Sequence, residues 1–516
     1  MELCTLHAAV EVQLDDMPYA DGAGYDPNRK CLAGTRGDIL DEITDWVNGG
    51  DDVPAIFFLS GVAGSGKSTI AHTVAGSFDK LKRLGASFCF DHARQAERRL
   101  DFVFSTIARD LAEFDPEIKK ILKQAVQLRK DCKSTHLHMQ FENFILKPVD
   151  ALEQTIGPIL IMIDGLDESG DQESREVLLK VLASGIPKLP SHVHVLITAC
   201  PEKDILDTFA GRPSVLWKQM DTIDPQSTNH DISLFIGHKL CGVEGLDKQW
   251  PDHVWCKLLT EMSEGLFQWA FTACHFIKGV GKAGQSPPAR LKQILSSSRP
   301  GHLDKLYLDV LKQNVAADDP EAMAQFKLIM SRILAAKEPL SVFMLNELQC
   351  TDDPEGLIWI IKYLGAVLSG INEHDVPVRP LHTSFHDFLV DPDRSREFYV
   401  DPSLGDQSLA FASLQAMKDG LHFNMCNLQT SYLPNNTVPE LATQVQNAIP
   451  SHLSYSCHYW AAHLQGTRFD VKLANEVKGF VHSQYLYWLE VLSLYNDIDI
   501  ASPAMMAASD WSQVSG

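Results

Sequence analysis

The sequence lacks several features that would place it in a simple class. None of its apolar runs approaches the roughly 18 residues that a membrane-spanning helix needs. Its 11 cysteines are dispersed without a Cys-x-x-Cys pair, which argues against a zinc site or disulfide framework and favours reduced thiols in a cytoplasmic protein. No basic flank precedes an apolar block at the N-terminus, so no secretory signal is predicted.

The sequence also has fewer basic than acidic residues. The 516-residue chain has 45 Lys and Arg against 67 Asp and Glu, which gives a formal net charge of −22. This balance argues against binding to nucleic-acid phosphates and against stable association with an anionic membrane. Hydrophobic residues make up 45% and charged residues 22%, which is ordinary globular composition. The length corresponds to roughly three to five domains.

Apolar runs alternate with helical patterns in the first half of the chain. Strands separated by helices are joined by right-handed crossovers, so the pattern predicts a parallel sheet that is covered on both faces. A helix is expected before the first strand, from Thr35 onward. The apolar runs are Ala55–Leu59, Ala86–Phe90, Ile159–Ile163, Val193–Thr198 and, more weakly, Val215–Trp217.

Helical patterns dominate the second half. A segment rich in Gly, Ser and Pro at 279–300 indicates a surface connection. Farther along, Ser341 is expected to cap a helix, another helix is expected from about Glu355 to Leu364, and a hairpin signal follows at 366–381, which together predict a winged helix. The predicted parts are a flexible leader (1–30), a P-loop domain (31–230), a helical domain and linker (231–300), a winged helix (301–395) and a C-terminal helical domain with its tail (396–516).

A phosphate-binding motif is the strongest signal in the sequence. Residues Gly61 to Ser68 match the pattern G-x-x-x-x-G-K-[ST] and lie between a predicted buried strand and a predicted helix. In this context backbone N–H groups and a helix N-terminus converge on phosphate oxygens. Lys67 is expected to reach the β- and γ-phosphates, and the Ser68 hydroxyl to bind Mg²⁺. The other predicted nucleotide-binding residues of this segment are Gly61, Gly64, Ser65, Gly66 and Thr69.

An acidic segment follows the third apolar run. It reads Asp164-Gly165-Leu166-Asp167-Glu168. A carboxylate at the end of a strand beside the phosphate loop can hold the metal, usually through water, and Asp164 has this position. Asp167 and Glu168 are candidate catalytic residues, because either can orient or deprotonate the attacking water.

These segments resemble a known family. The run from Asp164 to Glu168 is similar to the Walker B form of NACHT NTPases, which belong to the STAND class of P-loop proteins. With the phosphate-binding loop, the segments at 31–36, 78–81, 265–270 and 381–385 resemble fungal NACHT proteins that have a nephrocystin-like P-loop domain. The resemblance extends over roughly residues 31–495.

The resemblance implies a fold and a switch function. It implies an α/β P-loop NTPase core with a parallel five-stranded sheet, followed by a helical domain, a winged helix and a second helical domain. These parts would close around ADP and open when ATP replaces it, with Mg²⁺ as the metal. Protein partners stay unidentified, and an oligomer in the activated state is one option.

Two site residues follow from the resemblance alone. It places Arg36 beside the nucleotide base and His382 on the β-phosphate of ADP. The alternatives are a helix N-cap at Thr35 and an ordinary core role for His382. Only a short leader precedes Cys31, and the chain stops where the family's sensor repeats would begin, so a minimal or fragmentary member is expected.

One departure from the family pattern concerns hydrolysis. The fourth strand of the family ends in Thr-Ser-Arg-Pro, whereas this sequence has Thr-Ala-Cys-Pro at 198–201. Cys200 cannot supply a guanidinium to the γ-phosphate, so hydrolysis is expected to be weak or absent while nucleotide binding persists. Two functions therefore compete, a signalling switch with weak ATPase activity and a scaffold that binds nucleotide without hydrolysing it.

Overall fold

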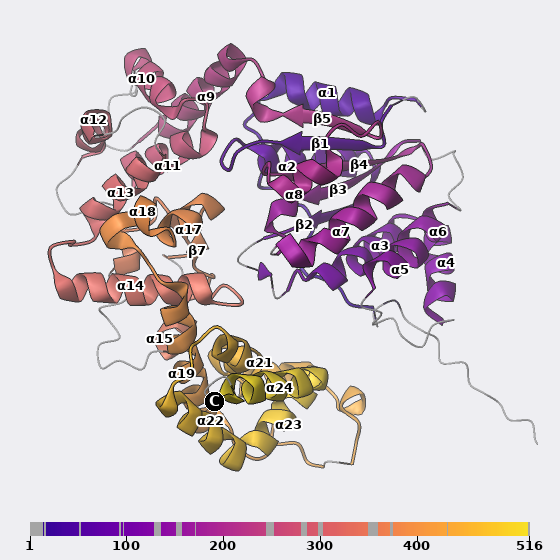
Figure 1. The fold of residues 1–516 in the computed structure, drawn as a ribbon, viewed down its shortest axis with the longest axis vertical. Helices are drawn as coiled ribbons and strands as arrows, with labels where there is room; N and C mark the ends of the chain where they lie inside the picture. Colours follow the sequence, from indigo (N-terminus) through magenta and orange to yellow (C-terminus); the bar gives the residue numbers. More distant parts are fainter. Residues whose placement is uncertain are drawn as a thin grey trace, which may run out of the picture. The chain divides into compact units, whose positions relative to one another are not determined.

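The computed structural model describes most of the chain. It forms two compact units, Met1–Phe271 and Thr272–Gly516 (Figure 1). The helix predicted from about Glu355 to Leu364 lies largely outside the described residues. The described residues are 14, 17–50, 53–91, 94–95, 97–127, 136–150, 157–170, 172–243, 252–279, 286–297, 303–348, 360–371, 375–430 and 432–513.

A parallel five-stranded sheet forms the centre of the first unit, as the alternating pattern predicted. Its strands are ordered β2-β3-β4-β1-β5. In the register of the sheet, Ser60 lies beside Ala199 and Cys89 lies beside Asp164, so the carboxyl ends of these strands meet at one edge. The strands are β1 (Ile56–Ser60), β2 (Leu84–Cys89), β3 (Ile159–Asp164), β4 (Val193–Ala199) and β5 (Val215–Gln219).

Helices cover both faces of this sheet, which explains why its strands are apolar throughout. Alternate residues of each strand point to opposite faces. On one face Phe57 and Leu59 pack with α1 and α2, and on the other Phe58 packs with α3, α7 and α8. These helices are α1 (Gly37–Val47), α2 (Lys67–Lys80), α3 (Val103–Phe114), α7 (Gln172–Gly185) and α8 (Lys203–Phe209).

The first unit also contains shorter elements and a helical extension, and its boundary at Phe271 falls within the last helix of that extension. The helix predicted from Thr35 begins at Gly37, and its buried face includes Ile39, Ile43 and Trp46. The remaining elements are η3 (Leu100–Phe102), α4 (Pro116–Gln127), α5 (Leu137–Gln140), η4 (Phe141–Leu146), α6 (Lys147–Val149), η6 (Leu166–Glu168), η7 (Ile186–Lys188), η8 (Met220–Thr222), α9 (Pro225–Leu240), α10 (His253–Ser263) and α11 (Phe267–Lys278).

The flexible leader predicted for 1–30 lies partly outside the described residues, at 1–13, 15 and 16, and its described part is packed. Residues 17–30 pack against the P-loop domain, and Met17, Ala20 and Ala23 are buried in its core. The backbone N–H of Cys89 in β2 donates to the carbonyl of Ala23 at 2.7 Å. Small and apolar residues spaced three apart therefore anchor a segment that lacks regular secondary structure.

The second unit is helical apart from one short hairpin. Ser341 caps α15 as predicted, since its hydroxyl accepts a hydrogen bond from the Met344 N–H at 3.2 Å. The predicted hairpin is present but short, with Leu368 opposite Pro380. Its elements are α12 (Pro287–Ser297), α13 (Leu303–Asn314), α14 (Pro320–Ala335), α15 (Val342–Glu347), β6 (Leu368–Ser369), β7 (Arg379–Pro380), α17 (Thr383–Leu389), α18 (Pro392–Ser395), η9 (Arg396–Phe398), α19 (Pro402–Gly420), η10 (Asn435–Thr437), α20 (Leu441–Ala448), α21 (Ser451–Gln465), α22 (Val471–Ser483), α23 (Tyr485–Tyr495), η11 (Ile498–Ile500) and α24 (Ala501–Gln513).

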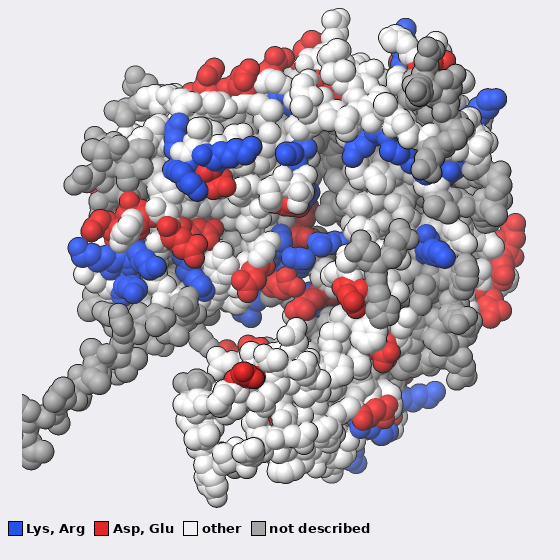
Figure 2. Space-filling model, turned by 180° about the vertical axis from the view of Figure 1, so that it is seen from behind, with Lys and Arg blue, Asp and Glu red and all other residues white. Residues whose placement is uncertain are grey.

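Charged side chains of both signs are interspersed on the face of the molecule shown in Figure 2. Ion pairs link charged side chains of opposite sign in the first unit, such as Lys218 with Glu42 at 2.7 Å. Among the described residues, no helix combines the length and the apolar character that crossing a membrane requires.

Candidate functional site

The predicted phosphate-binding loop joins β1 to the N-terminus of α2. Gly64 and Gly66 both have left-handed backbone conformations, with φ of 81° and 99°. A Cβ at Gly64 would also lie 2.6 Å from the Cβ of Gln268, so both backbone and space require glycine there. The N–H of Gln268, at the start of α11, donates to the Gly64 carbonyl at 3.1 Å. This contact gives the predicted 265–270 segment a role in shaping the loop.

Lys67 lies over this loop. Its side chain is buried, and its ammonium donates to the carbonyls of Gly61 and Val62 at 2.7 and 3.1 Å. Ser68 and Thr69 follow in the first turn of α2 and are partly buried. The buried Ser65 hydroxyl has no hydrogen-bond partner in the described part of the chain. A cationic group, an unpaired hydroxyl and a helix N-terminus therefore meet where the sequence predicted a phosphate site.

Asp164 ends β3 and is buried beside this loop's helix. Its carboxylate accepts a hydrogen bond from the Thr198 hydroxyl of β4, and its Oδ2 lies 3.6 Å from Nε2 of His72 in α2. Burial raises the pKa of the Asp164 carboxyl, but the neighbouring His72, the charge of Arg29 and the hydrogen bond from Thr198 lower it below its usual range. The carboxylate is therefore ionised at neutral pH and suited to holding a hard cation.

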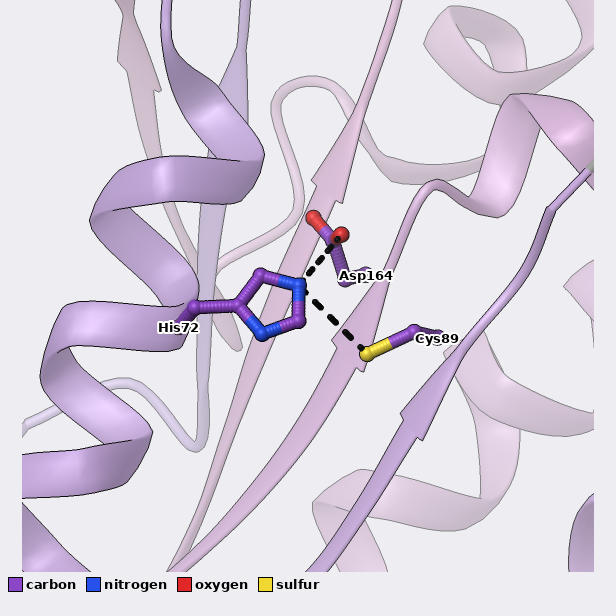
Figure 3. A group of neighbouring side chains, drawn as sticks. All are labelled: His72, Cys89 and Asp164. Atoms are coloured by element: carbon purple, nitrogen blue, oxygen red, sulfur yellow. Dashed lines mark hydrogen bonds and ion pairs between the residues drawn. The ribbon is translucent and has the colours of Figure 1, made fainter. Parts of the chain in front are cut away.

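His72, Cys89 and Asp164 form a close group at this point (Figure 3). Their ligand atoms all lie within 4.8 Å of one another, and all three side chains are buried. Burial, and next the charge of Asp164, raise the pKa of the Cys89 thiol far above its usual value. Neither His72 nor Thr198 was predicted from the sequence as a site residue. The signal for His72 was its position one helical turn after Ser68.

Asp167 and Glu168 lie in the short η6 helix after β3. Oδ1 of Asp167 accepts a hydrogen bond from the Cys200 backbone N–H at 2.9 Å, which ties this helix to the end of β4. The Gly165 N–H donates to the Thr198 hydroxyl at 3.0 Å. Both carboxylates are partly buried. The structure thus brings the predicted catalytic acids to the same edge of the sheet as Lys67.

Cys200 lies between Lys67 and Asp167. Its Sγ is 3.5 Å from the Lys67 ammonium. Burial and the neighbouring Asp167 carboxylate raise the pKa of the Cys200 thiol to about 12, so it stays protonated. The position where the family has an arginine therefore holds a neutral group.

An arginine from another element lies near Asp167. Its role was not predicted from the sequence. Arg175 of α7 is buried and donates to the Asp167 carbonyl at 2.6 Å. Its guanidinium also pairs with the carboxylates of Glu202 and Asp204. These partners hold it at the base of the acidic segment.

Arg36 reaches the phosphate loop from the N-terminus of α1. It donates to the Ser65 carbonyl at 3.0 Å and stacks over the Phe267 ring at 4.7 Å. The alternative of a cap at Thr35 is wrong, because Arg36 has the N-cap position and the Thr35 hydroxyl donates to the Leu32 carbonyl. Instead Asp231 of α9 accepts from the Arg36 N–H at 2.9 Å.

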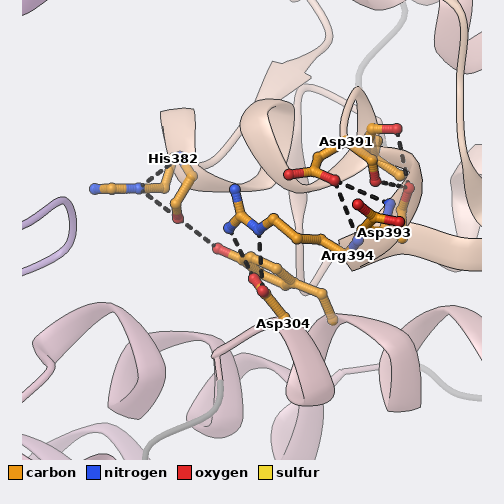
Figure 4. Close-up of polar contacts among 9 residues, drawn as sticks. Asp304, His382, Asp391, Asp393 and Arg394 are labelled. Carbon is orange, nitrogen blue, oxygen red and sulfur yellow. Dashed lines mark hydrogen bonds and ion pairs between the residues drawn. The ribbon is translucent and has the colours of Figure 1, made fainter.

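His382 lies in the second unit, at the N-cap of α17 (Figure 4). Its Nδ1 accepts from the Ser384 N–H at 3.1 Å, and the Ser384 hydroxyl bonds to Tyr307 at 2.9 Å. Nearby, Arg394 pairs through two nitrogens with Asp304 at 3.0 and 2.8 Å. His382 is partly buried and caps its helix.

The residues at the edge of the sheet fit a nucleotide with Mg²⁺. Hard oxygen donors suit this metal, and Ser68 and Asp164 supply a hydroxyl and an ionised carboxylate. The Ser65 hydroxyl, which has no hydrogen-bond partner among the described residues, and the glycine turns suit phosphate oxygens.

Comparisons with known proteins agree with this geometry. Residues 34–199 match the family model described as nephrocystin 3, N-terminal. The vegetative incompatibility protein HET-E-1 of Podospora anserina is 28% identical over 264 residues, which cover 45% of this chain and 18% of that protein. The chain thus matches less than a fifth of that relative's length.

A search of solved structures returned AMPPCP-bound DnaA from Aquifex aeolicus and PCH-2 from C. elegans. The first is 12% identical with a TM-score of 0.29, covering 66% of this chain and 91% of that chain. The second is 13% identical with a TM-score of 0.27, covering 53% and 68%. TM-scores this low mark different overall arrangements, so neither structure informs the function. Residues 34–199 form a nephrocystin-like P-loop domain, and the resemblance to fungal NACHT-type P-loop NTPases that the sequence predicted is confirmed.

Proposed function

We propose that this chain binds ATP or ADP with Mg²⁺ and acts as a NACHT-type signalling switch with weak or absent hydrolysis. The observation that carries the proposal is the convergence of Lys67, Ser68 and Asp164 at the carboxyl edge of the sheet. Open α/β sheets bind their ligands at this edge. The nephrocystin-like match over 34–199 supports the same assignment.

Each residue has a separate task in this proposal. Lys67 exchanges its two loop carbonyls for β- and γ-phosphate oxygens, while the N–H groups of the loop donate to the phosphates. Ser68 and Asp164 hold Mg²⁺, the latter through water. When bound, Mg²⁺ neutralises charge on the phosphates. Arg36 supports the loop from behind through the Ser65 carbonyl.

Slow turnover follows from the residues around the attacking water. Asp167 or Glu168 would orient that water, but Asp167 already accepts a bond from the Cys200 N–H. Cys200 is a neutral thiol, and Arg175 is paired with two carboxylates. A positive group aimed at developing charge on the γ-phosphate is therefore missing from this set. This observation is therefore also compatible with the second function, a nucleotide-bound scaffold without hydrolysis.

The wider parts of the proposal come from the sequence pattern and the resemblance. The pattern divides the chain into a leader and domains at 31–230, 231–300, 301–395 and 396–516, with 301–395 as a winged helix. The resemblance places His382 on the β-phosphate of ADP in the closed state. The net charge of −22 supports protein partners in the cytoplasm over nucleic acid. The vegetative incompatibility role in the relative's name supports signalling through such partners.

The test is the affinity of Lys67→Ala for ATP and ADP, measured by calorimetry with Mg²⁺. Hydrogen bonds to charged groups contribute about 1.5–3 kcal/mol, so we expect a loss of roughly 10- to 100-fold. Lys80→Ala is the matched control, because Lys80 is exposed in the last turn of the same helix. Asp167→Asn and Glu168→Gln should spare binding and remove residual hydrolysis. Equal affinities for wild type and Lys67→Ala would show that the loop does not bind phosphate.

A further inference from the structure

We propose that His72 is a positioning residue that orients the Asp164 carboxylate for the metal, and that the backbone of Asp26 fixes the tautomer which allows this. The inference rests on the proposed nucleotide-binding function. It connects the segment before residue 34, which lies outside the family match, to the centre of the site.

His72 lies on α2 beside the residues proposed to hold the metal. His72 follows Ser68 by four residues, so both side chains lie on the same face of the helix. Its Nε2 lies 3.6 Å from Oδ2 of Asp164 and 3.8 Å from the sulfur of Cys89 (Figure 3). The imidazole is buried, so water does not compete for these contacts.

A backbone hydrogen bond sets the tautomer of the His72 imidazole. The backbone N–H of Asp26 donates to Nδ1 of His72 at 2.8 Å. A ring nitrogen that accepts a hydrogen bond carries no proton, so the proton of the neutral ring is on Nε2. Nε2–H therefore faces the Asp164 carboxylate as a donor.

The same tautomer rules out a zinc site in the group of His72, Cys89 and Asp164. Their spacing, within 4.8 Å, suits a tetrahedral ion with bonds of about 2.0–2.3 Å. A metal on Nε2 needs the lone pair of that nitrogen, which would place the ring proton on Nδ1, against the Asp26 N–H. His72 therefore acts in this group as a hydrogen-bond donor and not as a metal ligand. The Asp164 carboxylate stays available to Mg²⁺.

Asp164 is consequently held from two sides. Its Oδ1 accepts from Thr198 of β4, and its Oδ2 faces Nε2–H of His72. Partners of this kind fix the orientation of metal-binding carboxylates, and their loss typically costs about 10- to 100-fold in metal affinity. At 3.6 Å the His72 contact is longer than a hydrogen bond, and such contacts in ligand-free sites shorten when the ligand binds.

The segment of residues 25–31, which we term the N-terminal strap, runs along α2. The Tyr25 hydroxyl donates to Asp79 at 2.7 Å, and the Cys31 N–H donates to the Thr73 hydroxyl at 2.8 Å. The bond from Asp26 to His72 lies between these two. The strap therefore holds Asp26 in register with His72 and makes the metal site depend on residues outside the matched range 34–199.

The first experiment compares His72→Gln with His72→Asn. A glutamine amide reaches about as far as Nε2 of histidine, whereas an asparagine amide reaches only to Nδ1. The readout is the ratio of ATP affinities measured with Mg²⁺ and with EDTA. We expect His72→Gln to keep the wild-type ratio and His72→Asn to lower it roughly 10- to 100-fold. His194→Gln is the control, because His194 is buried against Trp46 at 5.0 Å and away from the loop.

The second experiment removes the donor that sets the tautomer. Asp26→Pro has no backbone N–H, whereas Asp26→Ala keeps it and loses only the side chain. We expect the Mg²⁺-to-EDTA ratio to fall in the first variant and to stay at the wild-type value in the second. This pair keeps the proposal testable when a substitution at the buried His72 prevents folding.

Two outcomes would overturn the proposal. One is a Mg²⁺-to-EDTA ratio that stays at the wild-type value in His72→Asn and Asp26→Pro; if affinity falls equally with and without Mg²⁺, His72 is structural only. The other is stoichiometric zinc binding that Cys89→Ser abolishes, because it would show that Nε2 is a metal ligand. Absence of ATP binding by the wild type would instead overturn the proposed function.

Discussion

At the scale of single residues, Cys200 decides between the two proposed functions. Its sulfur lies 3.5 Å from the Lys67 ammonium, and its backbone N–H binds Asp167. It therefore touches both the phosphate-binding and the water-orienting residues. Because burial and Asp167 raise its thiol pKa to about 12, it adds no charge to the site.

We predict that Cys200→Arg raises the rate of ATP hydrolysis. The Asp167 carboxylate can balance a guanidinium beside Lys67, and a positive group near the γ-phosphate stabilises charge that develops in the transition state. Arginine fingers contribute about 10³–10⁵ in rate, and we expect less from this different element. The measurement is steady-state phosphate release alongside ATP affinity, which should change less than turnover. Cys200→Ser controls for the loss of the thiol.

Two results would contradict this prediction. Brisk hydrolysis by the wild type would show that the site needs no arginine at this position. A Cys200→Arg variant that melts like the wild type and binds ATP, yet shows no gain in rate, would show that Cys200 only packs at the end of the strand.

At the scale of elements, the approach of α19 to α14 sets the packing of the second unit. A Cβ added at Gly405 of α19 would lie 2.0 Å from the Ser331 carbonyl oxygen of α14. The backbone of one helix therefore contacts the other directly. In α22, by contrast, a Cβ added at Gly479 would meet nothing within 4 Å.

These two glycines should respond to alanine in opposite directions. We predict that Gly405→Ala lowers the free energy of unfolding by about 1–3 kcal/mol, because the helices must separate to admit the methyl group. Gly479→Ala should raise it by about 0.5–1 kcal/mol, because glycine is unfavourable inside a helix and space is available. Urea unfolding followed by circular dichroism measures both. If both variants lower the free energy of unfolding, the close contact with α14 is not the cause of the loss at Gly405.

The elements could be predicted from the sequence where the pattern is local. Five apolar runs predicted five parallel strands, and Ser341 was correctly predicted as a cap. The packed segment at 17–30 could not be predicted, because it is anchored by tertiary contacts such as that of Ala23 with Cys89. The alternative of a cap at Thr35 failed for a similar reason, since the carboxylate of Asp231, far along the chain, accepts from the Arg36 N–H at the start of α1.

The candidate site was predictable only in part. Lys67, Ser68 and Asp164 follow from two motifs whose spacing is local, and the parallel sheet brings both motifs to one edge. His72 and Arg175 belong to no motif, and Thr198 was noted only as the first residue of the Thr-Ala-Cys-Pro segment. Their roles therefore depended on strand order and side-chain contacts. Thr198 became visible only once β4 was placed beside β3.

At the scale of the whole molecule, a switch requires that a nucleotide bound in the first unit is sensed in the second. A ligand shifts a conformational equilibrium only by its difference in affinity for the two states. ADP and a non-hydrolysable ATP analogue must therefore differ in what they stabilise, whereas a passive scaffold would respond to both in the same way. The family resemblance implies that His382 senses this difference between the nucleotides.

We predict that ADP slows hydrogen exchange of the α17 amides more than the ATP analogue does, and that His382→Asn removes the difference. Asparagine is a good N-cap and should keep the helix that His382 now caps, while it loses the reach of the imidazole. Mass spectrometry of exchanged peptides measures this, with Lys67→Ala as the variant that should show no nucleotide response. A wild-type chain with equal exchange in both nucleotides would favour the scaffold. A difference that persists in His382→Asn would assign the coupling to other residues.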